Sequence, residues 1–523
     1  MFDLLIKSAR IIDGSGNPWF PGDIGMVKDR IAAIGRLRED AAKVIHADGK
    51  VVAPGFIDVH SHSDLFLMAS PESKPKVMQG VTTEVVGQDG LSEAPITTET
   101  LADWRKYLSG LNGDPEIEWN WRSFGEYLDA LTMAQPSINA ASLVGHGNLR
   151  LLTLGMENRQ PSTAELAKMK QILREAMAQG AFGMSTGLIY APCVYADTSE
   201  LTELCRVVAE LNGIFAVHMR DEGDQLFESI DEVIAVGEES ETPVHISHFK
   251  ASGRRNWGKV NEALLKLEKA RSRGIDVTIE QYPYVAGSTF LSSLLPAWAH
   301  EGGTNRMLAR LRDKTLRERI VQDISTGRSR DWTWNGVLVT SVTTEKNRAF
   351  EGRTLTEISE ALRKRPVDAL LDIIAEEDNA ATMVSFSMSE NDVRTVMQSR
   401  YQMVCTDGIM LGRPHPRVYG SFPRVLGRYV RNRVLRLEDA VRRMTSYPAR
   451  RLGLQDRGLI RPGMAADIVV FDPSTVIDTA TFEDPHRFPI GIEQVVVNGV
   501  LTVDKAAHTG ARAGRILRHN QTR

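Results

Sequence analysis

The stretch that most constrains the fold of this chain is residues 51–64, VVAPGFIDVHSHSD, an apolar run that ends in two histidines. Residues two apart in a β-strand point to the same side of the strand, so His60 and His62 would present both imidazoles to one spot. The carboxylates of Asp58 and Asp64 flank the pair. The pattern predicts a pair of metal ligands at the end of a buried strand.

Seven further strand-like runs follow along the chain and alternate with helix-length amphipathic segments such as 164–179 and 201–211. Alternation of this kind is typical of βα units that build a parallel sheet. Eight such strands are the number of a closed (β/α)₈ barrel, which we take as the predicted α/β fold class. The eight runs are 56–62, 82–90, 139–147, 181–190, 214–223, 243–250, 276–284 and 402–408.

The two ends of the chain follow a different sequence pattern. Residues 1–55 and 455–523 read as short strands separated by Gly and Asp turns, which predicts one composite β-sandwich around a barrel of residues 56–454. Residues 286–400, between the last two barrel strands, hold helical segments at 311–324 and 355–377 and an extra strand at 382–388. We expect this long excursion to be an insertion that serves as a lid or subdomain.

Potential metal ligands occur at the ends of several predicted strands. In a barrel the carboxyl ends of all strands meet at one face, so these side chains are expected to lie together. Neutral imidazole and carboxylate suit Zn²⁺ and its neighbours among the divalent metals. The candidate ligands are His60, His62, Asp89, His218, His248 and Asp407.

Composition excludes several classes of partner. The 523 residues include 63 basic and 67 acidic side chains, a net charge of −4, so no nucleic acid or anionic membrane partner is expected. No secretory signal or run of 18 apolar residues is present, which predicts a soluble cytoplasmic protein. The three cysteines are expected to be reduced thiols. A homo-oligomer is compatible with these features.

Several long motifs carry a resemblance to a known family. PGFIDVHSHSD resembles the first barrel strand of the amidohydrolase superfamily. The segments 185–201, 244–259, 280–289 and 415–431 are similar to the N-acyl-D-amino-acid deacylase (D-aminoacylase) family, and the similarity extends over nearly the whole chain. The resemblance implies metal-dependent hydrolysis of the amide bond of small N-acyl-D-amino acids, with one or two Zn²⁺ ions.

The resemblance also assigns roles to individual residues. It implies that the position of Asp89 holds a tight zinc together with His218 and His248, and that His60, His62 and Asp407 hold a weaker second ion. Asp407 would also act as the general base. The residues implied to contact the substrate carboxylate are Tyr190, Lys250, Tyr282, Ser288 and Arg417.

This chain departs from the family at residues 87–90, which read Gly-Gln-Asp-Gly where the family usually has Gly-Asn-Cys-Gly. Asp89 can coordinate or bridge metal ions, but a carboxylate is harder than a thiolate. We therefore expect weaker retention of Zn²⁺ and acceptance of Mn²⁺ or Co²⁺. His146, at the end of the third strand, either supports a metal ligand or makes a structural hydrogen bond.

Two other functions remain as alternatives. One is a cyclic-amide hydrolase of the hydantoinase or dihydroorotase type, or an isoaspartyl-type dipeptidase. Such relatives often use a carboxylated lysine at the end of the fourth strand, and the run 181–190 contains no lysine. The other is a barrel without catalytic activity that serves as a scaffold, which lost ligands would indicate.

Overall fold

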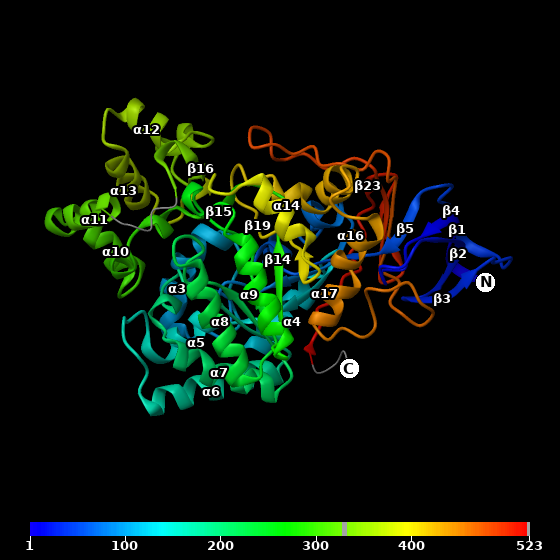
Figure 1. Ribbon diagram of the computed structural model, residues 1–523, viewed down its shortest axis with the longest axis horizontal. Coiled ribbons are helices and arrows are strands. Elements are labelled where there is room, and N and C mark those ends of the chain that lie inside the picture. Colours follow the sequence, from blue (N-terminus) through cyan, green and yellow to red (C-terminus); the bar gives the residue numbers. More distant parts are fainter. Residues whose placement is uncertain (327–331, 520–523) are drawn as a thin grey trace.

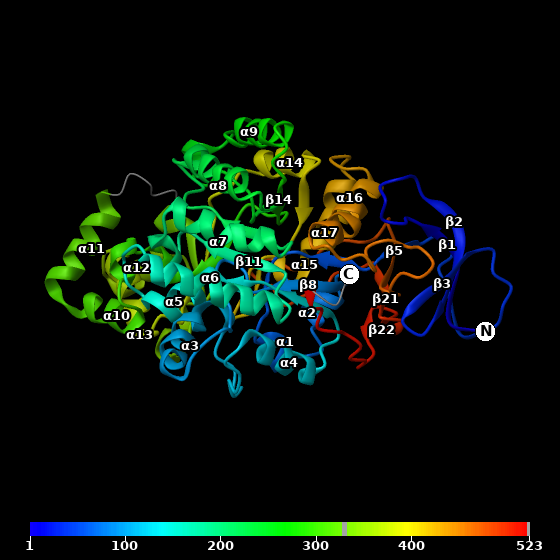
Figure 2. The ribbon, with the colours of Figure 1, turned by 90° about the horizontal axis from the view of Figure 1, so that it is seen from below.

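The computed structural model describes residues 1–326 and 332–519. A large sheet from both chain ends lies at one end of the molecule, parallel strands with their helices lie in the middle, and helices α10 to α13 lie at the other end (Figures 1 and 2). Residues 520–523 of the predicted terminal domain and 327–331 of the predicted insertion lie outside the described residues.

The terminal sheet joins the two ends of the chain. Its order is β23-β22-β21-β20-β5-β1-β2-β3, and β4 pairs with β1. The joining pair is antiparallel, with Ile468 opposite Pro54 and Phe471 opposite Val51. Residues 1–55 and the C-terminal segment therefore form one sheet. Its strands are β1 (Phe2–Ile11), β2 (Phe20–Val27), β3 (Arg30–Gly35), β4 (Ala41–His46), β5 (Val51–Pro54), β20 (Ile468–Phe471), β21 (Ile492–Val497), β22 (Val500–Asp504) and β23 (Ala507–His508).

The central strands pair in parallel. They form three sheets, with the strand orders β10-β11-β12-β13-β14-β18, β6-β8-β9 and β19-β7. All residues of these strands are buried, as expected for parallel strands covered on both faces. Their bounds are β6 (Phe56–Asp58), β7 (Ser61–His62), β8 (Val81–Val86), β9 (Asn139–Ser142), β10 (Val144–Gly145), β11 (Gly183–Gly187), β12 (Ile214–His218), β13 (Val244–Ile246), β14 (Val277–Gln281), β18 (Gln402–Val404) and β19 (Gly408–Ile409).

Helices cover these strands, and the sequence specifies where several of them begin. In α6 the Ser162 hydroxyl accepts a hydrogen bond from the backbone N–H of Glu165, whose carboxylate returns the contact as a capping box. Met169, Leu173 and Met177 then recur every four residues on its buried face. The helices of this region are α1 (Phe66–Ala69), α2 (Lys74–Val77), α3 (Thr98–Asn112), α4 (Phe124–Ala134), α5 (His146–Leu154), α6 (Thr163–Ala178), α7 (Thr198–Glu210), α8 (Leu226–Ser240), α9 (Val260–Ser272), α14 (Glu390–Gln398), α15 (Arg417–Arg424), α16 (Leu437–Met444) and α17 (Ser446–Arg451).

The histidine stretch 51–64 is divided among three sheets, and its predicted strand 56–62 is two short strands, β6 and β7. β5 belongs to the terminal sheet and β6 to the central strands, with Gly55 between them. The Gly55 N–H donates to the carbonyl of Asp467 at 2.8 Å, and a Cβ at Gly55 would lie 2.2 Å from the Thr82 hydroxyl oxygen. Only glycine fits this crossing, which carries the chain from the terminal sheet to the histidine pair.

Within residues 286–400, side chains from Leu291 to Met383 form a hydrophobic cluster separate from the main core. The antiparallel sheet β15-β17-β16 packs beside four helices. The predicted helical segment 355–377 is two helices, because Arg363 takes a left-handed conformation with φ 53° and Pro366 begins the second helix. The elements are β15 (Gly287–Phe290), β16 (Val337–Ser341), β17 (Thr382–Ser385), α10 (Thr304–Arg312), α11 (Lys314–Thr326), α12 (Leu355–Leu362) and α13 (Pro366–Glu376).

Among the described residues, no helix combines the length and the apolar character that crossing a bilayer requires.

Candidate metal centre

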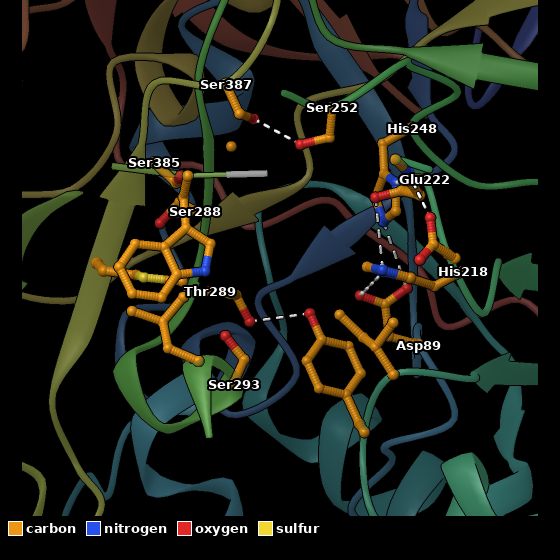
Figure 3. Close-up of a pocket in the computed structure, with 18 of the residues that line it drawn as sticks. Asp89, His218, Glu222, His248, Ser252, Ser288, Thr289, Ser293, Ser385 and Ser387 are labelled. Atoms are coloured by element: carbon orange, nitrogen blue, oxygen red, sulfur yellow. Dashed lines mark hydrogen bonds and ion pairs between the residues drawn. The ribbon is translucent and has the colours of Figure 1, made fainter. Parts of the chain in front are cut away.

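The six predicted ligands gather at the carboxyl ends of the central strands, where all of them are buried. His62 ends β7 and His218 ends β12, whereas the other four lie on the short segments that follow or separate strands. Figure 3 shows Asp89, His218 and His248 together on one side of a cavity. Their nitrogen and oxygen atoms form two groups that share Asp89: His60, His62, Asp89 and Asp407, and Asp89, His218 and His248.

The first group is compact. The Nε2 atoms of His60 and His62 lie 3.3 Å apart, as their i, i+2 spacing predicts. Asp407 Oδ1 lies 3.5 Å from His60 Nε2 and 3.2 Å from His62 Nε2. Asp89 Oδ1 lies 3.6 Å from His60 Nε2, and Asp89 Oδ2 lies 3.5 Å from His62 Nε2. Tetrahedral ligands at 2.0–2.1 Å from Zn²⁺ stand about 3.3–3.4 Å from one another, so these spacings fit one ion.

The second group is slightly wider. Asp89 Oδ2 lies 3.7 Å from His218 Nδ1, and Asp89 Oδ1 lies 3.9 Å from His248 Nε2. The two carboxylate oxygens of Asp89 thus face both groups. This arrangement is what a carboxylate that bridges two cations requires.

Several buried polar atoms of the centre have no hydrogen-bond partner among the described residues. They include both ring nitrogens of His218, Nδ1 of His62 and Oδ1 of Asp89. A buried polar atom without a partner costs about 1–3 kcal/mol, so a cluster of them needs a ligand. Imidazole and carboxylate donors fit Zn²⁺, and the residues present therefore fit a metal centre of one or two ions.

Electrostatics also favour a cation at this position. Burial lowers the pKa of His60, but the negative charges of Glu280, Asp407 and Asp89 outweigh it and raise this pKa to about 10. Burial raises the pKa of Asp89, whereas His60 and His218 hold it well below its usual range. A site that binds a proton so strongly is one where a metal cation can replace that proton.

A second layer of side chains orients His60. Its Nδ1–H donates to Glu280 Oε1 at 2.5 Å, and the other oxygen of Glu280 lies 2.9 Å from His245 Nε2. The carboxylate therefore fixes His60 with Nε2 directed at the first group. Glu280 lies at a predicted strand end, but the sequence spacing did not show whether its carboxylate supports a metal ligand or is a solvated charge. From its position three residues before His248, the His245 side chain was predicted to face away from His248. In the structure it shares the Glu280 carboxylate with His60.

Glu222 and Lys250 stand beside the second group. Glu222 Oε1 lies 3.0 Å from His248 Nδ1 and 2.5 Å from the Lys250 ammonium. Burial raises the pKa of Glu222, but Lys250 and His248 outweigh it and lower this pKa to about 2. Glu222 was not among the predicted site residues, although its position four residues after His218 in HMRDEG was the available signal.

A buried ionic network lies beneath the centre. The Lys76 ammonium donates to Asp58 Oδ2 at 2.6 Å, Ser61 Oγ at 2.8 Å and Thr406 Oγ1 at 2.6 Å. Thr406 precedes Asp407, and Ser61 lies between His60 and His62. Lys76 therefore ties the histidine segment to the aspartate segment.

A cavity of about 390 Å³ opens beside the metal centre. Four of the five predicted carboxylate contacts line it: Tyr190, Lys250, Tyr282 and Ser288. In Figure 3 a group of serines that includes Ser288, Ser385 and Ser387 lies across the cavity from Asp89.

Arg417 is absent from the cavity lining and lies behind Tyr282. Its guanidinium is 4.4 Å from the centre of the Tyr282 ring, and Nη2 donates to the carbonyl of Ser288 at 3.1 Å. Its Nη1 pairs with Asp407 Oδ2 at 2.9 Å. Burial raises the pKa of Asp407, but Arg417 and His60 outweigh it and lower this pKa. In this structure Arg417 is thus a partner of the predicted general base.

His146 directly follows the end of β10 (Val144–Gly145), as predicted, and is the first residue of α5. Its Nδ1 lies 2.9 Å from Thr186 Oγ1 and its Nε2 lies 2.7 Å from Glu200 Oε1. Both ring nitrogens are therefore used in hydrogen bonds away from the six ligands, which favours the structural alternative.

Comparison with known proteins identifies the family. The model of the amidohydrolase family matches residues 43–503. A D-aminoacylase of Alcaligenes xylosoxydans xylosoxydans is 39% identical over 519 residues, covering 99% of this chain and 97% of that protein. An N-acyl-D-glutamate deacylase of the same organism is 38% identical over 523 residues, covering 99% and 97%. The chain belongs to the amidohydrolase family.

A solved structure supports the same family assignment. The crystal structure of N-acyl-D-glutamate deacylase from Bordetella bronchiseptica, complexed with zinc and a phosphonate inhibitor, is 36% identical, with a TM-score of 0.84 over 99% of both chains. The fold is therefore that of the amidohydrolases, of TIM-barrel type with additional mixed sheets. The family resemblance stated from the sequence motifs is confirmed.

Proposed function

We propose that this protein is a metal-dependent amidohydrolase that hydrolyses the amide bond of N-acyl-D-amino acids, releasing a carboxylic acid and a D-amino acid. The observation that carries the proposal is the pair of ligand groups sharing Asp89 beside a cavity that also contains Lys250. The full-length relatives named above act on N-acyl-D-amino acids, by their names, and one was solved with zinc. We propose Zn²⁺ as the ion, in one or two copies, with Mn²⁺ or Co²⁺ as substitutes.

The proposed architecture places this centre at the mouth of a (β/α)₈ barrel formed by residues 56–454. Support comes from the chain itself, because β6 continues into β7, β9 into β10, and β18 into β19, so the three parallel sheets share neighbouring strands. Residues 1–55 and 455–523 would form the second domain. Residues 286–400 would serve as a lid, since the cavity is partly lined by Leu294, Met383 and Ser385 of this segment.

Asp407 is proposed to carry the proton. When bound, the metal ion lowers the pKa of a coordinated water and polarises the scissile carbonyl. Asp407 has one oxygen, Oδ1, among the ligand atoms and the other, Oδ2, against Arg417. It can therefore accept the proton of the attacking water and return it to the leaving nitrogen.

Lys250, Tyr190, Tyr282 and Ser288 are proposed to hold the α-carboxylate of the substrate from the cavity wall. The Nη1 of Arg417 is paired with Asp407, whereas its buried Nε makes no hydrogen bond within the described residues. We propose that Arg417 completes the set through Nε, because charge-assisted N–H donors to a carboxylate are among the stronger hydrogen bonds. Fixing the carboxylate and the amide together would select the D enantiomer.

The cyclic-amide alternative receives less support. The strand that would carry a carboxylated lysine, β11, spans Gly183–Gly187 and contains none. The scaffold alternative is also disfavoured, because all six residues at the centre retain side chains able to bind metal.

One assay tests the proposal. The purified protein, with its metal content measured, is incubated with matched N-acetyl-D-amino acids, N-acetyl-L-amino acids and hydantoins, and the released amine is quantified on a chiral column. We expect turnover of the D series that is lost on chelation and restored by Zn²⁺. L-preference, or turnover of hydantoins alone, would overturn the assignment.

A further inference from the structure

Glu222 lies on the segment between β12 and α8, where it faces the second ligand group and the cavity at once (Figure 3). Its side chain is 10% exposed. Besides the contacts to His248 Nδ1 and Lys250, its Oε2 lies 3.6 Å from His218 Nε2. The carboxylate therefore stands against two candidate ligands and one candidate substrate contact.

The two histidines are held between opposite carboxylates. Asp89 faces Nδ1 of His218 and Nε2 of His248, and Glu222 faces the remaining nitrogen of each ring. A neutral imidazole carries its proton on one nitrogen only and binds metal through the other. For both rings to direct a lone pair at the side of Asp89, the proton must lie on the side of Glu222.

Lys250 makes the choice of tautomer at His248 depend on Glu222. The Lys250 ammonium lies 2.7 Å from His248 Nδ1 as well as 2.5 Å from Glu222. An ammonium only donates hydrogen bonds, so on its own it would turn Nδ1 into an acceptor. His248 would then carry its proton on Nε2, the nitrogen that faces Asp89, and could not bind a metal ion there.

We propose that Glu222 is a positioning residue of the metal centre: it keeps the proton of His248 on Nδ1, the nitrogen away from Asp89, and draws the Lys250 ammonium off His248. The inference rests on the proposed metal centre but not on the identity of the substrate. Carboxylate partners of metal-binding histidines typically contribute 10–100-fold in metal affinity.

The test measures metal affinity of the full-length protein by competition with a chelator, using Zn²⁺, and the ligand-field absorption of bound Co²⁺. We expect Glu222→Met to weaken one of the two ions about 10–100-fold and to change its Co²⁺ spectrum. Glu222→Gln, which can still accept a hydrogen bond from one ring, should lose less.

The double variant distinguishes a positioning role of Glu222 from a structural one. Adding Lys250→Met to Glu222→Met removes the donor that imposes the wrong tautomer, so we expect the double variant to bind metal more tightly than Glu222→Met alone. A merely structural role of Glu222 predicts equal or greater loss. The matched control is Asp221→Asn, which removes a charge from the same segment; the Asp221 carboxylate accepts hydrogen bonds from the backbone N–H groups of Gly223 and Gln225.

Four outcomes separate the hypotheses. A wild-type protein that binds no ion would overturn the metal centre itself. Wild-type affinity in Glu222→Met would overturn the positioning role, as would a loss in Asp221→Asn as large as that in Glu222→Met. Recovery in the double variant, with metal-free unfolding midpoints unchanged, would support it.

Discussion

Replacing Lys76 by methionine tests how far the buried ionic network supports the fold beneath the metal centre. The Lys76 side chain is 1% exposed and pairs with Asp58 at 2.6 Å and with Glu84 at 3.4 Å, both fully buried. Methionine is close in volume but leaves both carboxylates without their cation. Both oxygens of Glu84 have no hydrogen-bond partner within the described chain, so no hydrogen bond there compensates for the loss of the cation.

Breaking a buried ion pair by removing one partner costs about 3–5 kcal/mol, because a charge is left buried and unpaired. We expect Lys76→Met to lower the free energy of unfolding by that amount. Equilibrium unfolding in urea, followed by tryptophan fluorescence, gives the difference.

Lys74→Met is the matched control for this prediction. Lys74 lies in the same helix with a side chain 46% exposed, and its pair with Glu72 is at 4.0 Å. Exposed pairs of this kind contribute about 0–1 kcal/mol, so the control should unfold close to the wild type. A loss below about 1 kcal/mol in Lys76→Met, or equal losses in both variants, would refute the reasoning.

Three further predictions concern the centre and the segment 286–400. Asp407→Asn should lower kcat about 10²–10⁴-fold in a folded protein, and activity within tenfold of wild type would place the general base elsewhere. After identical dialysis against chelator, metal analysis should find less metal in Asp89→Ala and more zinc in Asp89→Cys than in the wild type, since thiolate is the softer ligand. Burial lowers the pKa of His300 from 6.5 to about 4, so the unfolded chain binds more protons between these values. Stability should be fully present above pH 6.5 and fall as pH drops from 6.5 toward 4; His300→Gln should flatten this dependence in urea unfolding, and an unchanged slope would contradict it.

The features that the sequence predicted well depend on local geometry. The i, i+2 spacing of His60 and His62 brings their Nε2 atoms together because alternation along a strand is fixed by the backbone. The eight strand runs were found because parallel strands buried on both faces read as short apolar runs. The boundary between residues 55 and 56 was predicted, but the requirement for glycine at this crossing was not, since it depends on Thr82, which is distant in sequence.

The features that sequence reasoning missed depend on long-range contacts of charged residues. Lysine is seldom fully buried, so nothing marked Lys76 as the centre of a network. Glu222 lies beyond the strand end, where a carboxylate is usually solvated. Arg417 was expected in the cavity wall, but it begins α15 and lies behind Tyr282, where Asp407 holds it.

The backbone conformation of the candidate ligands explains why strand periodicity predicted their positions in the chain but not the directions of their side chains. Asp89, His248 and Asp407 all have positive φ, at 57°, 31° and 49°. Such conformations cost about 1–3 kcal/mol each outside glycine and persist only where surrounding contacts enforce them, as at functional sites. Aspartate is among the residues that tolerate them best, and histidine is also enriched there. The chain thus leaves these three strands in a turn that directs the side chain inward, and three of the six residues proposed to hold the metal carry backbone strain.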